Sequence, residues 1–322
     1  MLSLPDFKEK KVIICLATEG QKISFRNDNL LIKDSEDQIV LQATCHRIFS
    51  VWIIGHITMT SGIIQRSQKF AFSIYLLSYG HRLYGVWNNV TEGNFLLREK
   101  QYAHQSLALA KHIVANKIGN QLILIQKIRT KSERDKEAIN LLKGYREAVL
   151  NVSELKSILG YEGSASRIYF KHFFDNFNWE GRKPRTKINP VNTVLDIGYT
   201  YLFNFIDSLL NLYGFDVYKG IYHQSFYQRK SLVCDLVEPF RCLIDSQVKK
   251  SWNLGQFKDK DFLQIKKQYF LKRDVNKEYV SVLVKAILEH KEDMFDYVQK
   301  YYRAFMRDKA AEEFPIFEIE NN

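Results

Sequence analysis

Four side chains in the second half of this 322-residue chain could together hold a metal ion. They are three carboxylates and one histidine, namely Glu162, His223, Asp235 and Glu238. Carboxylate oxygen and imidazole nitrogen suit a hard or borderline divalent cation, for which Mg²⁺ or Mn²⁺ is expected. Such an ion can polarise a phosphoryl oxygen and lower the pKa of a hydroxyl group. The set therefore predicts metal-assisted chemistry on phosphate.

The spacing of Asp235 and Glu238 strengthens this interpretation, because residues three apart share one face of a helix. Apolar residues surround both acids, so the two carboxylates should face a cleft or a cation. The alternative is a solvated helix face with Arg241 as partner. Glu162 could be an acid favoured only by a helix N-terminus, and a lone histidine such as His223 is more often a surface or core residue.

The elements that must position these side chains fall into two regions. From Lys11 to about Trp87 the chain is a series of short β-rich runs separated by turns, with a covering helix expected over Ile63–Tyr79 and a last strand over Arg82–Trp87. Beyond Glu92 the apolar residues repeat with the helical period. We expect an α+β protein with a small N-terminal β-rich domain, residues 1–90, and a larger all-α catalytic domain, residues 91–322.

Within the helical region, a helix is expected to begin at Ser153-Glu154 and end at Gly160, with Glu162 opening the next one. The most apolar stretch, Val194–Phe215, is interrupted by polar side chains and predicts a buried helix and no membrane span. His223 lies in a stretch without clear period. The acidic C-terminal tail, from Glu312, is expected to be mobile at its tip.

The formal net charge of +11 favours an acidic partner, either nucleic acid or an anionic membrane surface. The four cysteines form no CxxC pair, which argues against a zinc ribbon and a disulfide framework and favours a reducing cytosol. Charged residues within Met1–Lys11 exclude an export signal there. The chain has no Walker-type glycine-rich phosphate loop, so nucleotide hydrolysis is disfavoured.

A basic loop near Trp179 could contact the phosphates of double-stranded DNA, with Trp179 or Phe177 stacking on a splayed base. Its cations are Arg182, Lys183, Arg185 and Lys187. An ordinary solvated loop is the equal alternative. Arg229 and Lys230 are comparable candidates for DNA contact because they lie near His223 in the chain.

Several segments occur in the order seen in a known family. They are Lys117-Ile118 with Asn120-Gln121, Tyr161-Glu162-Gly163 with Arg167-Ile168-Tyr169-Phe170, Asn189-Pro190-Val191-Asn192, and His223 to Asp245 with Arg229-Lys230-Ser231-Leu232 and Asp235-Leu236-Val237-Glu238-Pro239-Phe240-Arg241. Together they resemble the CRISPR-associated adaptation integrase, Cas-one, over nearly the whole chain. The resemblance implies a homodimer, with the β-domain as dimer and partner surface, that assembles with a small second adaptation protein, Cas-two, in the prokaryotic cytoplasm.

The resemblance also implies catalytic roles for particular residues. Glu162, His223 and Glu238 would be the metal ligands, and Asp235 a neighbouring acid that supports the site or binds metal in some states. Some members have Asp in place of Glu238, a difference of one methylene.

The implied activity is integration of new DNA in CRISPR spacer acquisition. The 3′-hydroxyl of a short donor duplex would attack the phosphodiester at a CRISPR repeat boundary, and the same site could act as an endonuclease. Two alternatives remain: a non-catalytic nucleic-acid-binding scaffold, and a plain metal-dependent nuclease.

Overall fold

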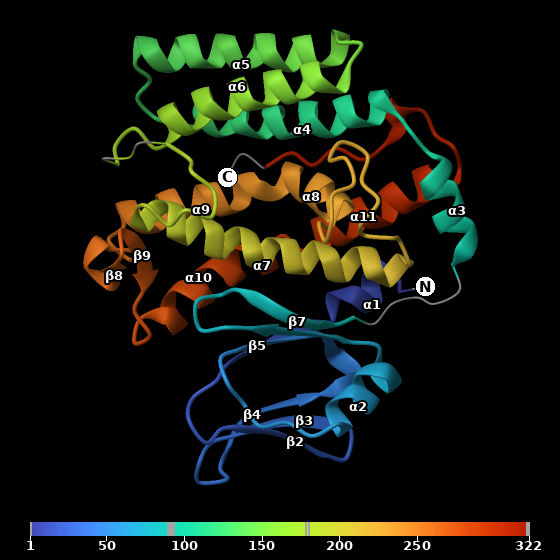
Figure 1. The fold of residues 1–322 in the computed structure, drawn as a ribbon, viewed down its shortest axis with the longest axis vertical. Coiled ribbons are helices and arrows are strands. Elements are labelled where there is room, and N and C mark those ends of the chain that lie inside the picture. Colours follow the sequence, from blue (N-terminus) through green and yellow to red (C-terminus); the bar gives the residue numbers. More distant parts are fainter. Residues whose placement is uncertain (1, 89–93, 178, 180, 320–322) are drawn as a thin grey trace. The chain divides into compact units, whose positions relative to one another are not determined.

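The computed structural model describes residues 2–88, 94–177, 179 and 181–319, and the chain divides into two units. The β unit comprises Met1–Gly93 with Ser208–Gly214, and the helical unit comprises Asn94–Asp207 with Phe215–Asn322. The first is rich in strands and the second is mostly helical (Figure 1), which confirms the predicted α+β fold class. The predicted domain boundary at residue 90 falls among residues 89–93, outside the described residues.

The β unit contains two sheets. In the first, β1, β5 and β6 run parallel and β7 pairs antiparallel with β6, whereas β2, β3 and β4 form an antiparallel meander. The elements are α1 (Leu4–Lys8), β1 (Lys11–Leu16), β2 (Lys22–Arg26), β3 (Asn29–Lys33), β4 (Ile39–Thr44), η1 (Cys45–Arg47), β5 (Ile48–Ile54), α2 (Gly62–Phe70), β6 (Ser73–Leu77) and β7 (Leu83–Trp87).

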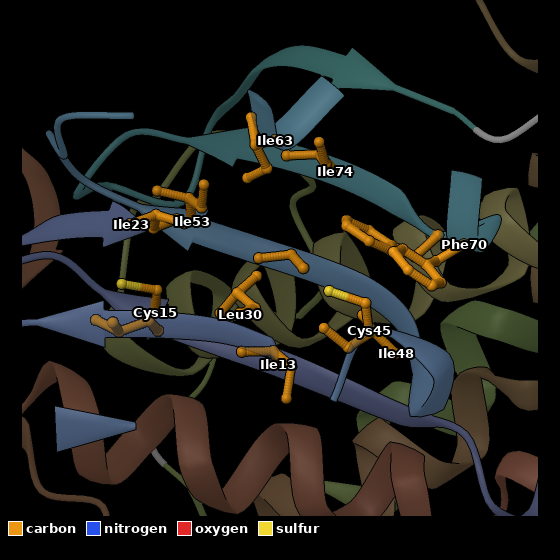
Figure 2. Close-up of a cluster of buried hydrophobic side chains, with 13 residues drawn as sticks. Ile13, Cys15, Ile23, Leu30, Cys45, Ile48, Ile53, Ile63, Phe70 and Ile74 are labelled. Atoms are coloured by element: carbon orange, nitrogen blue, oxygen red, sulfur yellow. The ribbon is translucent and has the colours of Figure 1, made fainter. Parts of the chain in front are cut away.

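One apolar core joins both sheets and α2. Ile13 of β1, Leu30 of β3, Ile53 of β5 and Phe70 of α2 all belong to it (Figure 2). β5 is buried along its whole length because it pairs on both edges inside a parallel sheet.

The prediction of one helix over Ile63–Tyr79 is wrong in its second half. The helix α2 ends at Phe70, Ala71 takes a left-handed conformation with φ of 57°, and β6 begins at Ser73. The β6 strand pairs with β5 and β7, which are distant contacts that no local period reveals. Both elements present buried apolar residues, so periodicity alone could not separate them.

The helical unit is built around long helices and includes one small hairpin. Its elements are α3 (Phe95–Ala103), α4 (Leu107–Gln126), α5 (Glu133–Asn151), α6 (Leu155–Phe173), α7 (Pro190–Tyr213, whose last residues fall in the β unit), α8 (Ser231–Val237), η2 (Glu238–Phe240), α9 (Arg241–Asn253), η3 (Asp259–Asp261), β8 (Phe262–Ile265), β9 (Gln268–Leu271), α10 (Asn276–Glu289), α11 (Lys291–Met306) and η4 (Ala311–Glu313).

Three of these helices, α4, α5 and α6, pack against one another, each contacting the other two (Figure 1). Side chains cap the starts of two of them: Ser106 caps α4 through Leu109 N, and Ser132 with Asp135 forms a capping box on α5. The predicted break at Gly160 is wrong, because α6 continues through it from Leu155 to Phe173. Glu162 therefore lies inside a helix, where it faces α4.

Two further features of the helical unit were not predicted. The hairpin of β8 and β9 interrupts the expected all-α region, and the C-terminal segment is docked rather than loose as far as Ile319, with Phe317 buried against Phe240 at a ring distance of 4.5 Å. The predicted mobile tip, residues 320–322, lies outside the described residues. Among the helices that the structure describes, none has the length and apolar character needed to span a membrane.

Candidate metal centre

Two of the predicted acids meet across a lysine. Glu162 of α6 and Glu238 of η2 both contact the ammonium group of Lys117 of α4, and the distance from Lys117 Nζ to Glu238 Oε2 is 2.6 Å. Ser166, one turn after Glu162, donates a hydrogen bond to Glu162 Oε1 over 3.0 Å. Three segments far apart in the sequence thus bring two carboxylates to one cation.

The carboxylate of Glu238 is the more buried of the two, with its side chain 5% exposed. Arg241 supplies a second cation, its Nε lying 3.0 Å from Glu238 Oε1. Burial raises the pKa of Glu238, but Arg241 and Lys117 outweigh burial and hold this pKa at about 2. Glu238 is therefore ionised throughout the physiological range.

Lys117 is held in its charged form by the same contacts. Burial lowers the pKa of the Lys117 ammonium group, but Glu238 and Glu162 outweigh burial and raise it. An unpaired charge in so enclosed a position would cost several kcal/mol, whereas paired carboxylates and cations offset much of that penalty.

The other two predicted residues form a second pair. His223 Nδ1 lies 2.7 Å from Asp235 Oδ1, and because a carboxylate only accepts hydrogen bonds, Nδ1 is the donor. This tautomer leaves Nε2 with a free lone pair, as in the carboxylate–histidine pairs that support metal ions. His223 lies in the irregular segment before α8, as predicted from the absence of a regular pattern in that stretch of sequence.

Asp235 has no oxygen left for a metal ion. The backbone N–H groups of Ile221 and Tyr222 donate to Oδ2 over 2.6 and 3.1 Å, while the N–H of His223 and its Nδ1 donate to Oδ1. The side chain is fully buried. The structure thus places Asp235 as a positioning residue that fixes the segment carrying His223.

The two pairs lie within one electrostatic neighbourhood. His223 is among the groups that lower the pKa of Glu238. Burial first, and then Glu162, Glu238 and Asp235, raise the pKa of the Tyr222 hydroxyl. Carboxylates of both pairs therefore act on the Tyr222 hydroxyl.

The donor set fits a divalent ion in chemistry, and the contacts of Lys117 show that the two glutamates already converge on a positive charge. In the part of the chain that the structure describes, no group of three His, Cys, Asp or Glu side chains is close enough to hold a metal ion as it stands. The glutamates and His223 Nε2 would have to draw together, with the Lys117 ammonium shifting away from the carboxylates.

Comparison with known proteins decides the family, since the model of the family described as CRISPR associated protein Cas1 matches residues 14–285. The chain belongs to the Cas1 family. The resemblance predicted from the sequence motifs is thereby confirmed.

Individual relatives agree with this assignment. The CRISPR-associated endonuclease Cas1 1 of Thermodesulfovibrio yellowstonii is 28% identical over 274 residues, covering 80% of this chain and 86% of the relative. A chain of a Cas6-RT-Cas1–Cas2 complex matches with a TM-score of 0.83 and 24% identity, over 97% of this chain and 36% of that longer one. A casposase bound to its integration product matches with a TM-score of 0.77 and 20% identity, over 97% and 96% of the two chains. At these identities the two structures establish a shared fold.

Within this Cas1 fold, the predicted DNA-contacting residues divide into two kinds. Arg182 and Lys230 make internal ion pairs: Arg182 Nη2 lies 2.5 Å from Asp196 Oδ1, and Lys230 Nζ lies 2.7 Å from the fully buried Asp207. Both side chains are largely enclosed, so we assign them to holding the fold.

The remaining cations differ in how freely they face solvent. Lys183 and Arg185 are exposed, whereas Lys187 is half-buried with its Nζ 4.5 Å above the ring of Phe270. Arg229 folds back onto the carbonyl of Gln224 and the ring of Phe226. Lys183 and Arg185 keep the geometry best suited to phosphate contact.

The predicted base-stacking residues are engaged elsewhere. Trp179 packs against Phe174 at 4.9 Å, and Phe177 packs against Phe174 and Trp252. In contrast, Phe226 and Tyr227, in the segment after His223, are 72% and 83% exposed. These two aromatic residues were not singled out in the sequence, although their position between His223 and Arg229 was a signal for them.

Lys117 lies at the centre of the site, but the sequence assigned it no role. It was visible only as part of a motif, and nothing in the spacing of α4 indicates that its side chain meets acids 45 and 121 positions away. The same holds for Asn120, whose side-chain amide donates to Pro239 O over 3.0 Å and to Phe317 O over 2.8 Å.

Proposed function

We propose that this protein is the integrase of CRISPR spacer acquisition. It joins the 3′-hydroxyl ends of a short donor duplex to a CRISPR repeat boundary by metal-dependent transesterification, and it can cut DNA as an endonuclease. The observation that carries the proposal is the meeting of Glu162 and Glu238, from distant elements, beside the Asp235-oriented His223. Membership in the Cas1 family and the endonuclease name of the curated relative support it.

In the proposed site, Glu162, Glu238 and His223 Nε2 would hold Mg²⁺ or Mn²⁺. When bound, the ion would polarise the phosphoryl oxygen, lower the pKa of the attacking hydroxyl and stabilise developing negative charge. Asp235 fixes the tautomer and direction of His223. Because His223 serves as a ligand, it is not assigned as the general base.

Arg241 and Lys117 supply the positive charge that keeps Glu238 ionised, and Lys117 also contacts the carboxylate of Glu162. A carboxylate must be deprotonated to bind a metal ion, so these cations prepare the ligands. They also add positive charge near the place where a phosphodiester would lie, which favours a polyanionic substrate.

The proposed partners are double-stranded DNA, a second copy of this chain and the small second adaptation protein. A Cas1–Cas2 complex is among the solved structures with this fold, and the casposase is bound to its integration product. The net charge of +11 suits a DNA partner. We expect the β unit to carry the dimer and partner surface.

Strand transfer tests the proposal. An end-labelled duplex with free 3′-hydroxyls is incubated with a plasmid carrying the cognate repeat, the partner protein, and either Mn²⁺ or EDTA. Wild type should give joined product only with the divalent ion, and Glu238→Gln should give none while it still binds DNA.

Other results would support the alternatives. Cut DNA without joined strands would indicate a plain nuclease. A chain that binds DNA but neither joins nor cuts it with any divalent ion would be a scaffold, and the ion pairs of Glu162 and Glu238 would then be structural only.

A further inference from the structure

The hairpin of β8 and β9 and the loop at Arg182–Lys187 are tied into one surface. Tyr269 N donates to Lys187 O over 2.7 Å, and Gln268 Nε2 donates to Thr186 O over 3.4 Å. On the same edge of β9, Thr193 Oγ1 donates to Tyr269 O over 3.0 Å. Because Gln268 directly follows the hairpin turn, these bonds bring the turn and the loop together at the edge of the helical unit (Figure 1).

The backbone of this surface holds basic residues in conformations that cost free energy. Lys266 and Lys267 form the two-residue turn between β8 and β9, with φ of 47° and 65°. Two positive φ values in a two-residue hairpin turn strongly favour Asn-Gly. In the loop, Arg185 and Lys187 also have positive φ, at 63° and 53°.

Left-handed conformations at side chains other than Gly, Asn and Asp cost roughly 1–3 kcal/mol each and concentrate at functional positions. Elsewhere the chain does place a favoured residue in such a turn, since Asn27 has φ of 52° between β2 and β3. Lysine at both turn positions therefore preserves positive charge at the tip of the hairpin at the expense of turn stability.

The charge on this surface is open to solvent. Arg185, Lys266 and Lys267 are exposed, and among the described residues no carboxylate lies within ion-pair distance of their side chains. We name these three residues the basic hairpin surface. Several exposed cations on one surface match the repeated phosphates of a nucleic-acid backbone better than a single small anion.

We propose that the basic hairpin surface binds the phosphate backbone of duplex DNA. The choice of DNA as the polyanion rests on the proposed function. Lys266 and Lys267 thereby become DNA-contacting residues outside the metal centre, and Arg185 acts with them. Such contacts position the duplex without reading its sequence.

The test replaces the turn by the residues that its conformation prefers. In Lys266→Asn/Lys267→Gly the hairpin should be at least as stable as in wild type, because the turn loses its strain. Affinity of the full chain for a fluorescein-labelled duplex, measured by anisotropy, should fall roughly tenfold or more at 0.1 M salt. The slope of log affinity against log salt should decrease by about 1.8, since each phosphate contact contributes about 0.9.

Two further variants make the outcome specific. Lys143→Gln/Lys285→Gln removes the same charge from exposed positions on α5 and α10 and should leave affinity and slope close to wild type. Lys266→Gln/Lys267→Gln keeps the length of the side chains and should lose affinity as the first variant does, which excludes an effect of the altered turn.

Three results would overturn the proposal. The first is a turn variant whose affinity and salt slope equal those of the α5 and α10 control. The second is loss of binding to the partner protein, with DNA affinity kept, in Lys266→Gln/Lys267→Gln, which would make the hairpin a protein-docking surface. The third, a wild-type chain that binds no duplex at any salt, would contradict the proposed function itself and this proposal with it.

Discussion

The ammonium group of Lys117 occupies the position between Glu162 and Glu238 that a metal ion would compete for. In Lys117→Met the two carboxylates lose their shared cation, so the helical unit should lose about 3–5 kcal/mol of stability in EDTA. Mn²⁺ should then raise the melting temperature of the variant more than that of wild type, because the ion replaces the missing charge.

Differential scanning fluorimetry with and without Mn²⁺ measures this effect of Lys117. Lys143→Met, at an exposed position of α5, is the matched control and should behave as wild type. An equal Mn²⁺ shift in wild type and Lys117→Met would show that the ion binds elsewhere.

Gly220 lets the segment carrying His223 close onto Asp235. A Cβ atom at Gly220 would lie 2.5 Å from His223 O and 2.8 Å from Asp235 Oδ2. Gly220→Ala should therefore displace His223 and lower the rate of strand transfer by on the order of 100-fold, since small errors in placing a catalytic group are costly. Gly144→Ala, where a Cβ would meet nothing within 4 Å, should keep full activity. Full activity in Gly220→Ala would remove the case for a fixed His223.

Asp245 is a buried acid that accepts hydrogen bonds from the hydroxyls of Tyr169 and Tyr199. Burial raises its pKa to about 6, against the lowering effects of these two bonds and of Arg241 and Arg182. The neighbouring Cys242 adds a further titratable group.

Because the pKa of Asp245 is higher in the folded chain than the ordinary 3.8, its contribution is fully present below pH 3.8 and is lost as pH rises to about 6. Relative to Asp245→Asn, wild type should become more stable as pH falls through this window, by about 3 kcal/mol in total. Urea unfolding at pH 4.5 and 6.5 measures most of the change, with the exposed Asp274→Asn as control. A stability difference that is independent of pH would show that Asp245 titrates normally.

At this scale the metal-binding role of the acids and the histidine stays a prediction, and most of their hydrogen-bond and ion-pair partners could not be predicted from the sequence. Residue type and spacing singled out Glu162, His223, Asp235 and Glu238. Asp235 differs from the other three residues because four N–H groups donate hydrogen bonds to its carboxylate. Likewise, nothing in the neighbouring sequence distinguished Arg182, which forms an ion pair, from the exposed Arg185.

The C-terminal segment acts as a structural element although its described residues after η4, as far as Ile319, form no regular secondary structure. Asn116 of α4 exchanges hydrogen bonds with the backbone of Phe317, and Asn120 accepts from Ile319 N over 2.8 Å. Since Asn120 also bonds Pro239 O, the residue after Glu238 is tied to this segment. The segment therefore supports the position of Glu238.

Removal of the Phe317 ring should destabilise the protein and weaken the candidate metal centre. Phe317→Ala should cost about 3–5 kcal/mol of stability, because the buried ring fills space against Phe240. It should also weaken Mn²⁺ binding, which calorimetry would report. Ile316→Ala, at a side chain that is 54% exposed in the same segment, should change stability by less than about 0.5 kcal/mol. Equal effects of the two substitutions would contradict a supporting role.

Helices with a long apolar period could be predicted from the sequence. Strands that depend on pairing with distant segments could not. The buried helix expected over Val194–Phe215 corresponds to α7. The expected break at Gly160 failed because glycine is tolerated inside a helix that packs against α4 and α5. β6 and the β8–β9 hairpin were missed because partner strands and turn conformation, rather than local composition, define them.

For the whole molecule, the net charge of +11 and the order of motifs predicted a DNA-acting protein of the Cas1 family, and the family model confirms the family. The fold class followed from the change of period near residue 90. The roles of the homodimer, the partner protein and DNA stay predictions, because each depends on a second molecule.

One proposed property underlies the catalytic role: Glu162, His223 and Glu238 would together hold a single divalent ion. The most direct measurement is a calorimetric titration of the whole protein with Mn²⁺, because it needs neither DNA nor the partner. Wild type should bind about one ion per chain at this site, and Glu238→Gln and His223→Ala should each abolish that binding while the thermal transition persists. Saturable binding that survives both substitutions, or no saturable binding in wild type, would contradict the site.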